Sequence, residues 1–181
     1  MSNNRRLREY DYRQSGGYFI TINSWHRFNA SSQILNGEII LSDQGKIIEK
    51  CWLEIPKHFK NIDLGVYAIM PDHFHGIVII NYALTSMDGR CEDVNDTLVT
   101  AKHASQLPDD MKNGTKPGSL SAIIQSFKSS STKLIHSDLN INNPIWQRSF
   151  YDHIIRDESE LRKIHDYIVN NSSQWPGNPA F

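Results

Sequence analysis

The chain has 181 residues, of which 39% are hydrophobic and 22% charged, a composition typical of a folded single domain and not of a disordered or fibrous protein. The longest strongly apolar run, residues 76–80, is far too short to cross a bilayer, and the Arg-rich N-terminus has no apolar signal segment. We therefore expect no membrane partner and a cytoplasmic location. The net charge of -1 provides no general attraction for nucleic acid, so DNA binding would depend on where the charges lie.

The charges are distributed unevenly. The first thirteen residues carry the arginines Arg5, Arg6, Arg8 and Arg13. In contrast, residues 87–110 carry a run of carboxylates within a stretch that has no sustained hydrophobic period. We expect residues 1–16 to form a basic N-terminal arm and residues 17–175 to form one domain, with a flexible insertion at about 81–117 and a tail at 176–181.

The predicted elements alternate between strands and helices. In chain order they are a strand at 17–23, a hairpin at 34–41, a helix from Ser42 or Asp43 to Pro56, strands at 62–70 and 73–80, a helix from Ser119 through Leu134, a strand at 144–155, and a helix from Asp157. Asn36-Gly37 marks the hairpin turn, and Asp157 with Glu160 resembles a capping box. This order predicts an α+β fold: a ferredoxin-like (split βαβ) antiparallel sheet with helices on one face and an added C-terminal helix.

Two histidines lie at the start of the strand predicted for residues 73–80. The period of two sends His73 and His75 to the same face, about 6.6 Å apart along the chain, while Phe74 turns to the other. Two imidazoles on neighbouring positions can converge on one metal ion, although a His-x-His pair is also common as a structural or surface feature. Because the strand continues as an apolar run, polar side chains at its end need a partner.

The last predicted helix carries a tyrosine beside its buried stripe. Leu161, Ile164 and Ile168 form that stripe, and Tyr167 and Asn171 share an edge next to it at i, i+4 spacing. A tyrosine in this place is often only a boundary residue with its ring packed and its hydroxyl in water. The helix geometry alone therefore leaves its role open.

Several separate motifs resemble those of the REP-associated tyrosine transposases, which belong to the single-tyrosine HUH transposase family. The motifs are Glu9-Tyr10-Asp11-Tyr12 with Gly17-Tyr18-Phe19-Ile20-Thr21, Met70-Pro71 before Asp72-His73-Phe74-His75-Gly76-Ile77, Trp146-Gln147-Arg148 before Tyr151-Asp152-His153-Ile154-Ile155-Arg156, and Glu160-Leu161 before Tyr167-Ile168-Val169-Asn170-Asn171. The likeness spans residues 5–175 in order and leaves only the segment from about 81 to 117 unaligned. Ser172 stands where the family commonly has a proline.

The resemblance implies that His73, His75 and Asn171 hold a divalent metal, Mg²⁺ or Mn²⁺, and that Tyr167 is the nucleophile. It further implies a metal-dependent endonuclease and strand transferase that acts on single-stranded DNA beside a hairpin and forms a covalent 5′-phosphotyrosine. It leaves open whether Tyr167 acts within its own chain or in a partner subunit of a homodimer.

Five arginines are candidates for DNA contact. They are Arg5, Arg6 and Arg8 in the arm, together with Arg148 and Arg156. Arg148 and Arg156 are equally well interpreted as members of structural ion pairs. Two other functions remain as alternatives: a catalytically silent, sequence-specific DNA-binding module, and a nucleotide hydrolase of the histidine-triad type. The hydrolase would need a further histidine where Ile77 stands.

Overall fold

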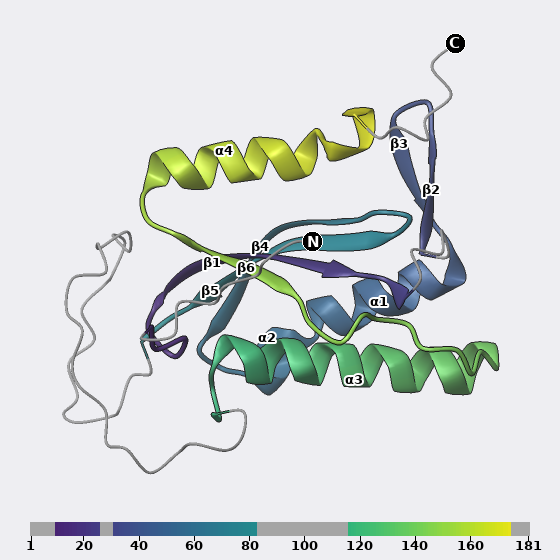
Figure 1. Cartoon of the computed structure of the whole chain (residues 1–181), viewed down its shortest axis with the longest axis horizontal. Coiled ribbons are helices and arrows are strands. Elements are labelled where there is room, and N and C mark those ends of the chain that lie inside the picture. The colour runs from purple at the N-terminus through teal and green to yellow at the C-terminus, as the bar shows by residue number, and fades with distance from the viewer. Residues whose placement is uncertain (1–9, 26–30, 83–115, 175–181) are drawn as a thin grey trace.

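The computed structural model describes residues 10–25, 31–82 and 116–174, which form a four-stranded sheet with helices on both faces (Figure 1). The strands are β1 (Gly16–Asn23), β4 (Ile62–Ile69), β5 (His73–Ile80) and β6 (Tyr151–Ile155). Their order across the sheet is β4-β5-β1-β6, and every neighbouring pair is antiparallel. This is the order of a ferredoxin-like unit, so the α+β fold expected from the sequence is confirmed.

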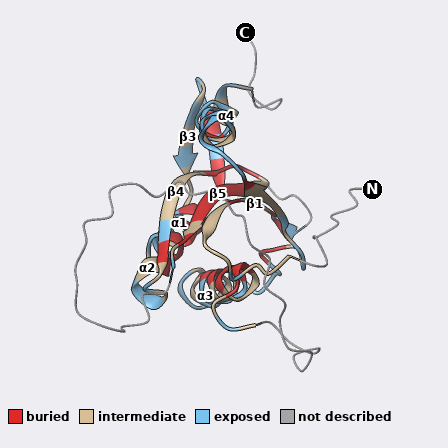
Figure 2. Ribbon diagram, turned by 90° about the vertical axis from the view of Figure 1, so that its left-hand side faces the viewer, coloured by how far each residue is buried: buried red, intermediate tan, exposed pale blue. Residues whose placement is uncertain are grey.

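The helices divide between the two faces of the sheet (Figures 1 and 2). One face is covered by α1 (Asp43–Leu53), α2 (Ile55–His58) and α3 (Leu120–Leu139). The other face is covered by α4 (Glu158–Val169), which is followed by the short 3₁₀ helix η2 (Asn171–Gln174). Of the described helices, only α4 and the short η2 that follows it lie on this face, whereas α1, α2 and α3 lie on the opposite face.

Local sequence signals account for the element boundaries. Side-chain oxygens of Ser42, Ser119 and Asp157 cap α1, α3 and α4 by accepting backbone N–H groups in the first turn. The strands β2 (Ser32–Leu35) and β3 (Glu38–Leu41) form a hairpin. Its turn residues, Asn36 and Gly37, both have positive φ, as a two-residue hairpin loop of this kind requires.

The alternation of β1 and β5 produces two cores. On the α1 and α3 side, fully buried residues such as Tyr18, Trp52 and Phe74 form the larger cluster. The smaller cluster lies under α4 and includes Ile77, Ile155 and Ile168. No side chain fits at Gly76 in β5, because a Cβ there would lie 2.7 Å from Cζ2 of Trp52. β5 is thereby held close against α1.

Three predicted boundaries were wrong. The first helix was expected to run to Pro56, but α1 ends at Leu53 and Pro56 lies in α2. The strand expected at 144–155 is present only over Tyr151–Ile155, preceded by an isolated bridge between Ser24 and Trp146. The carbonyls of Gln147 and Arg148 accept hydrogen bonds from the Lys128 ammonium, which pulls this segment toward α3. The last helix ends at Val169, so Asn171 does not continue it.

Parts of the predicted organisation fall outside the described residues. These are residues 1–9 of the arm, residues 83–115 of the insertion, and residues 175–181. In the part of the chain that the structure describes, no helix is both long and apolar enough to span a membrane.

Candidate active site

The two histidines at the start of β5 project toward α4, on the face opposite the larger core. The centroids of the His73 and His75 rings lie 4.4 Å apart, and Phe74 between them is fully buried on the other face. The strand period predicted this arrangement. The structure therefore places the two imidazoles side by side on one surface, as a shared ligand would require.

The Nδ1 atom of each histidine has a polar partner. Nδ1 of His73 lies 2.5 Å from Oδ1 of Asp72, and Nδ1 of His75 lies 2.8 Å from Oγ1 of Thr21, its neighbour across the strand pair. A carboxylate only accepts, so Nδ1 of His73 donates this hydrogen bond. Such partners commonly orient histidines that bind metals through the other nitrogen. The orientation of both rings is thus fixed through Nδ1.

The electrostatic environment keeps His75 neutral. Its side chain is 4% exposed. Burial, followed by the nearby His73 imidazole, lowers the pKa of His75 to about 3. At neutral pH the ring is therefore unprotonated, which is the form that can donate a lone pair to a metal ion.

Tyr167 reaches this pair within the same chain. Its hydroxyl oxygen lies 3.4 Å from Nε2 of His75, and its ring meets the edge of Phe19 with centroids 6.1 Å apart. The tyrosine is 50% exposed, so a substrate can approach its hydroxyl. The separation is at the long end of a hydrogen bond, as is usual for catalytic groups without substrate. The Tyr167 hydroxyl therefore lies beside the histidine pair within one chain.

The docking of α4 fixes the position of Tyr167. Ile168 is buried against β4 and β5 residues of the smaller core, with Leu161 and Ile164 packed beside it. At the other end of the helix, Glu160 accepts from the backbone N–H of Arg156 at 2.8 Å and lies 2.7 Å from Nε2 of His153 on β6. Both hydrogen bonds lower the pKa of Glu160, the Arg156 bond contributing most. The helix is held at both ends.

Asn171 lies two residues beyond Val169, the last residue of α4, and is the first residue of η2. The expected i, i+4 relation to Tyr167 on one continuous helix is therefore wrong. The amide Nδ2 is buried and has no hydrogen-bond partner among the described residues. The η2 helix packs against α4 and β3, and among the described residues no hydrogen bond joins Asn171 to His73, His75 or Tyr167.

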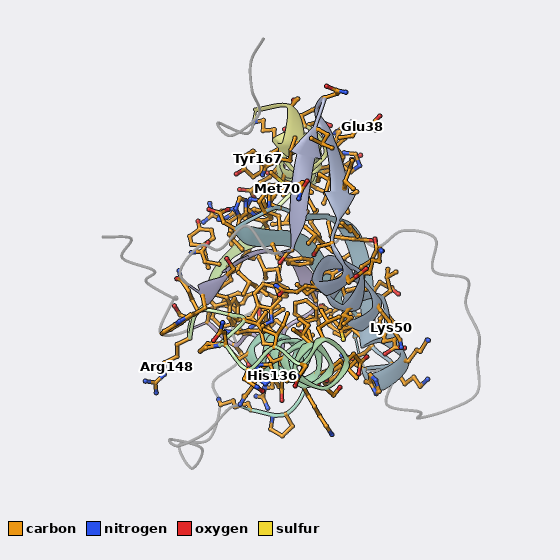
Figure 3. All side chains as sticks on the ribbon, turned by 90° about the vertical axis from the view of Figure 1, so that its right-hand side faces the viewer. Glu38, Lys50, Met70, His136, Arg148 and Tyr167 are labelled. Atoms are coloured by element: carbon orange, nitrogen blue, oxygen red, sulfur yellow. The ribbon has the colours of Figure 1, made fainter. Side chains whose placement is uncertain are left out.

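The candidate DNA-binding arginines lie in different places. Arg156 is exposed at the junction of β6 and α4, on the same side of the sheet as the histidines. Arg148 is exposed on the far side, where Figure 3 shows it well separated from Tyr167. Arg5, Arg6 and Arg8 lie outside the described residues. No ion pair joins Arg148 or Arg156 to another described residue.

The residues that support this site were not predicted from the sequence. Thr21, Asp72 and Phe19 contact the histidines or Tyr167, and Glu160 anchors the helix. The alternation of side chains along a strand is a signal that could have placed Thr21 and Phe19 on the same face of β1. The pairing of β1 with β5, which brings Thr21 opposite His75, is a tertiary feature that no local pattern contains.

No family model matches the sequence. An uncharacterized protein of Haemophilus influenzae is 35% identical over 170 residues, which cover 94% of this chain and 87% of that protein. A solved structure of a REP-associated tyrosine transposase bound to a REP hairpin is 20% identical, has a TM-score of 0.54, and is matched over 97% of this chain and 81% of its own. The chain belongs to one family with the Haemophilus influenzae protein, and its fold is that of the REP-associated tyrosine transposase.

Proposed function

We propose that this protein is a transposase that nicks and rejoins single-stranded DNA at hairpin sites, with Tyr167 as the nucleophile. The observation that carries the proposal is the 3.4 Å separation between the Tyr167 hydroxyl and Nε2 of His75 within one chain. The REP-associated tyrosine transposase with the same fold was solved with a REP hairpin bound, which supports hairpin DNA as the partner of this chain.

In this proposal His73, His75 and Asn171 hold a divalent metal, Mg²⁺ or Mn²⁺. The fit rests on two adjacent imidazoles whose Nδ1 atoms are already engaged, of which His75 is neutral at pH 7, and on the unpartnered buried amide of Asn171. Imidazole and amide ligands with water suit Mn²⁺, and Mg²⁺ also accepts such mixed shells. The ion, when bound, supplies positive charge to a non-bridging phosphate oxygen. A homodimer and a cytoplasmic location stay predictions.

The proposed reaction exchanges one phosphodiester for another. The phenolic oxygen of Tyr167 attacks the phosphorus, and the bond from phosphorus to the 3′ oxygen breaks. The phenol loses its proton, and the departing 3′ oxygen gains one, so protons balance. The product is a 5′-phosphotyrosine and a free 3′ hydroxyl. Because the number of phosphoester bonds is conserved, rejoining needs no ATP.

The site favours this chemistry over the nucleotide hydrolase. A histidine-triad hydrolase would place a third histidine at position 77. Ile77 is 1% exposed and belongs to the smaller core beneath α4, where it cannot meet a substrate. A catalytically silent DNA-binding module would bind the same DNA but form no covalent bond to it, so formation of a covalent adduct distinguishes the two functions.

The test is formation of a covalent protein-DNA adduct. Labelled single-stranded hairpin DNA is incubated with the protein and Mn²⁺, and the mixture is run on a denaturing gel. We expect a protein-linked band that Tyr167→Phe abolishes. The matched control is Tyr82→Phe, a 75% exposed tyrosine just beyond the opposite end of β5, which should keep the band. Tight binding without any adduct would instead support the silent module.

A further inference from the structure

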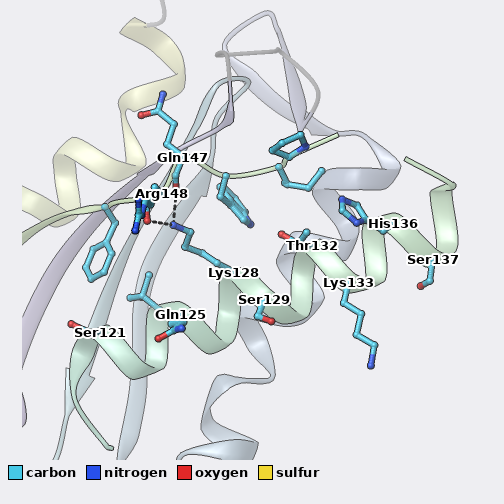
Figure 4. Close-up of a pocket in the computed structure, with 15 residues that line it drawn as sticks. Ser121, Gln125, Lys128, Ser129, Thr132, Lys133, His136, Ser137, Gln147 and Arg148 are labelled. Atoms are coloured by element: carbon cyan, nitrogen blue, oxygen red, sulfur yellow. Dashed lines mark hydrogen bonds between the residues drawn. The ribbon is translucent and has the colours of Figure 1, made fainter. Parts of the chain in front are cut away.

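A second polar feature lies on the far side of the sheet from Tyr167. It is a groove between α3 and residues 144–150, with a cavity volume of about 1160 Å³ (Figure 4). Figure 3 shows Arg148 and His136, which line it, well away from Tyr167. We call this feature the α3 groove. Its lining is the α3 surface together with the irregular segment that replaced the first half of the predicted last strand.

The described lining of the α3 groove is cationic. Lys128, Lys133 and Arg148 line it, along with His136 and several hydroxyl and amide side chains, and none of the described lining residues is Asp or Glu. The whole chain carries slightly more acidic than basic residues. A surface lined by positive charge alone is therefore a local departure from the composition, and it complements an anionic ligand.

Lys128 is the central group of the α3 groove. Its ammonium donates to the carbonyl of Gln147 at 2.6 Å and to the carbonyl of Arg148 at 3.1 Å (Figure 4). Burial lowers its pKa, yet its described partners are carbonyl dipoles and include no carboxylate. An ammonium has three N–H donors, and these two bonds use only two. The positive charge and one donor are left for a ligand, and the carbonyl bonds hold the amine in place.

The position of the α3 groove relative to the sheet indicates which anion it takes. β6 is an edge strand of the sheet, and Arg148 and Phe150 precede it directly. Within β6, Tyr151 pairs with Thr21, which contacts His75. Residues 148–151 thus connect the α3 groove to the edge strand β6, and Tyr151 lies opposite Thr21, the residue that contacts His75. A polyanionic chain lying over this edge would contact both places.

We propose that the α3 groove binds the phosphate backbone of single-stranded DNA, with Lys128, Lys133 and Arg148 as the contacting cations. This inference rests on the proposed function, because it takes DNA as the substrate. It adds a phosphate-binding surface remote from the scissile bond, on the opposite face of the sheet. The groove holds the strand and does not take part in the covalent step.

The test measures binding without cleavage. A labelled oligothymidine of about 20 nucleotides is titrated in EDTA by fluorescence anisotropy at several salt concentrations. For single strands, each neutralised phosphate contributes about 0.7 to the slope of log affinity against log salt. The double variant Lys133→Gln with Arg148→Gln should reduce the slope by about 1.4, and Lys128→Gln, which keeps an amide donor for the carbonyls, by about 0.7.

The matched control removes equal charge elsewhere. Lys46 and Lys57 are exposed on α1 and α2, which pack near β4 at the opposite edge of the sheet. Lys46→Gln with Lys57→Gln should leave the slope as in the unmodified protein, and so should Tyr167→Phe. A loss of slope in this control equal to that of the groove variants would overturn the inference.

Two further results would also overturn it. One is an unchanged slope of log affinity against log salt in the groove variants, whether or not Tyr167 forms its adduct. The other is tighter binding of labelled polyglutamate than of the oligonucleotide, which would assign the α3 groove to an acidic polypeptide. Failure of the proposed function has a different signature, since loss of the adduct leaves the anisotropy result intact.

Discussion

On the face of the sheet covered by α1 and α3, β1 and β5 present Tyr18, Ile20 and Phe74, all at 0% exposure. On the face covered by α4, the same two strands present Thr21 and His75, which form a hydrogen bond beside a half-exposed tyrosine. Figure 2 shows the buried residues concentrated in the sheet and along α3. The strand β5 therefore has two different roles: its even positions stabilise the fold, and its odd positions near the start form the site.

The largest effect of a substitution is expected on the face of the sheet that α1 and α3 cover. Phe74→Ala should lower the free energy of unfolding by about 3–5 kcal/mol, because it removes a fully buried ring in contact with Trp52 and leaves a cavity. Urea unfolding measures the change. Leu53→Ala, on a residue that is 52% exposed on α1, is the control and should change stability by no more than about 0.5 kcal/mol. A small change for Phe74 would contradict the division of the two faces.

Substitution of the neighbouring residue, His73, should reduce activity and leave stability nearly unchanged. His73→Ala should reduce adduct formation by about 10²–10³-fold, because the site loses one ligand of the proposed metal ion that supplies positive charge to the phosphate. Its side chain is 16% exposed and lies outside both apolar cores, so the melting temperature should change little. The rate of adduct formation with Mn²⁺ measures the effect, and His58→Ala on α2 is the matched histidine control. Loss of stability without loss of activity would refute the assignment.

The partner of His75 should have an intermediate effect. Thr21→Val keeps the β-branched shape but removes the hydroxyl that lies 2.8 Å from Nδ1 of His75. Residues that orient a metal-binding histidine typically influence metal affinity or activity by about 10–100-fold. We expect the Mn²⁺ concentration for half-maximal adduct formation to rise by that factor. Thr21→Ser, which retains the hydroxyl, should restore most of the activity, and equal behaviour of both variants would contradict the role.

The smallest effect is expected at the anchor of α4. Glu160→Gln should lower stability by about 1 kcal/mol at pH 7, because a neutral amide forms weaker hydrogen bonds with the Arg156 N–H and with His153 than a carboxylate does. The pKa of Glu160 is lowered in the folded chain from its usual value of 4.5. Its stabilisation is therefore present above that value and disappears as the pH falls through the folded-state pKa.

Urea unfolding at pH 7 and at about pH 3 measures this difference between Glu160→Gln and the unmodified protein. The difference should shrink at the lower pH. Glu158→Gln, whose carboxylate forms only an exposed ion pair with Arg162 at 3.6 Å, is the control and should have an effect below about 0.5 kcal/mol. A difference that grows on acidification would show that the carboxylate is not what anchors the helix.

The sequence predicted the face with the site better than the groove behind it. Alternation in β5 predicted that His73 and His75 share a surface, and the Asp157 cap predicted where α4 begins. The end of α4 was missed although Asn170, its C-cap, is of a residue type that often ends helices, because local turn geometry sets helix ends to within only one or two residues.

The α3 groove was missed for a different reason. Lys128 looks like a solubilising residue on the polar face of a helix, and its partners are carbonyls about 20 residues away in sequence. Backbone carbonyls have no sequence signature, so a contact of this kind cannot be predicted from residue types. Charge, burial and the path of residues 144–150 were all needed to find it.

The most direct test of the central claim is to identify the residue that carries the DNA. The adduct formed with hairpin DNA and Mn²⁺ is digested with protease and nuclease, and the peptides are sequenced by mass spectrometry. The account predicts a single nucleotide-bearing peptide with the phosphate on the Tyr167 oxygen. A nucleotide on any other residue, or an adduct that persists in Tyr167→Phe, would contradict it.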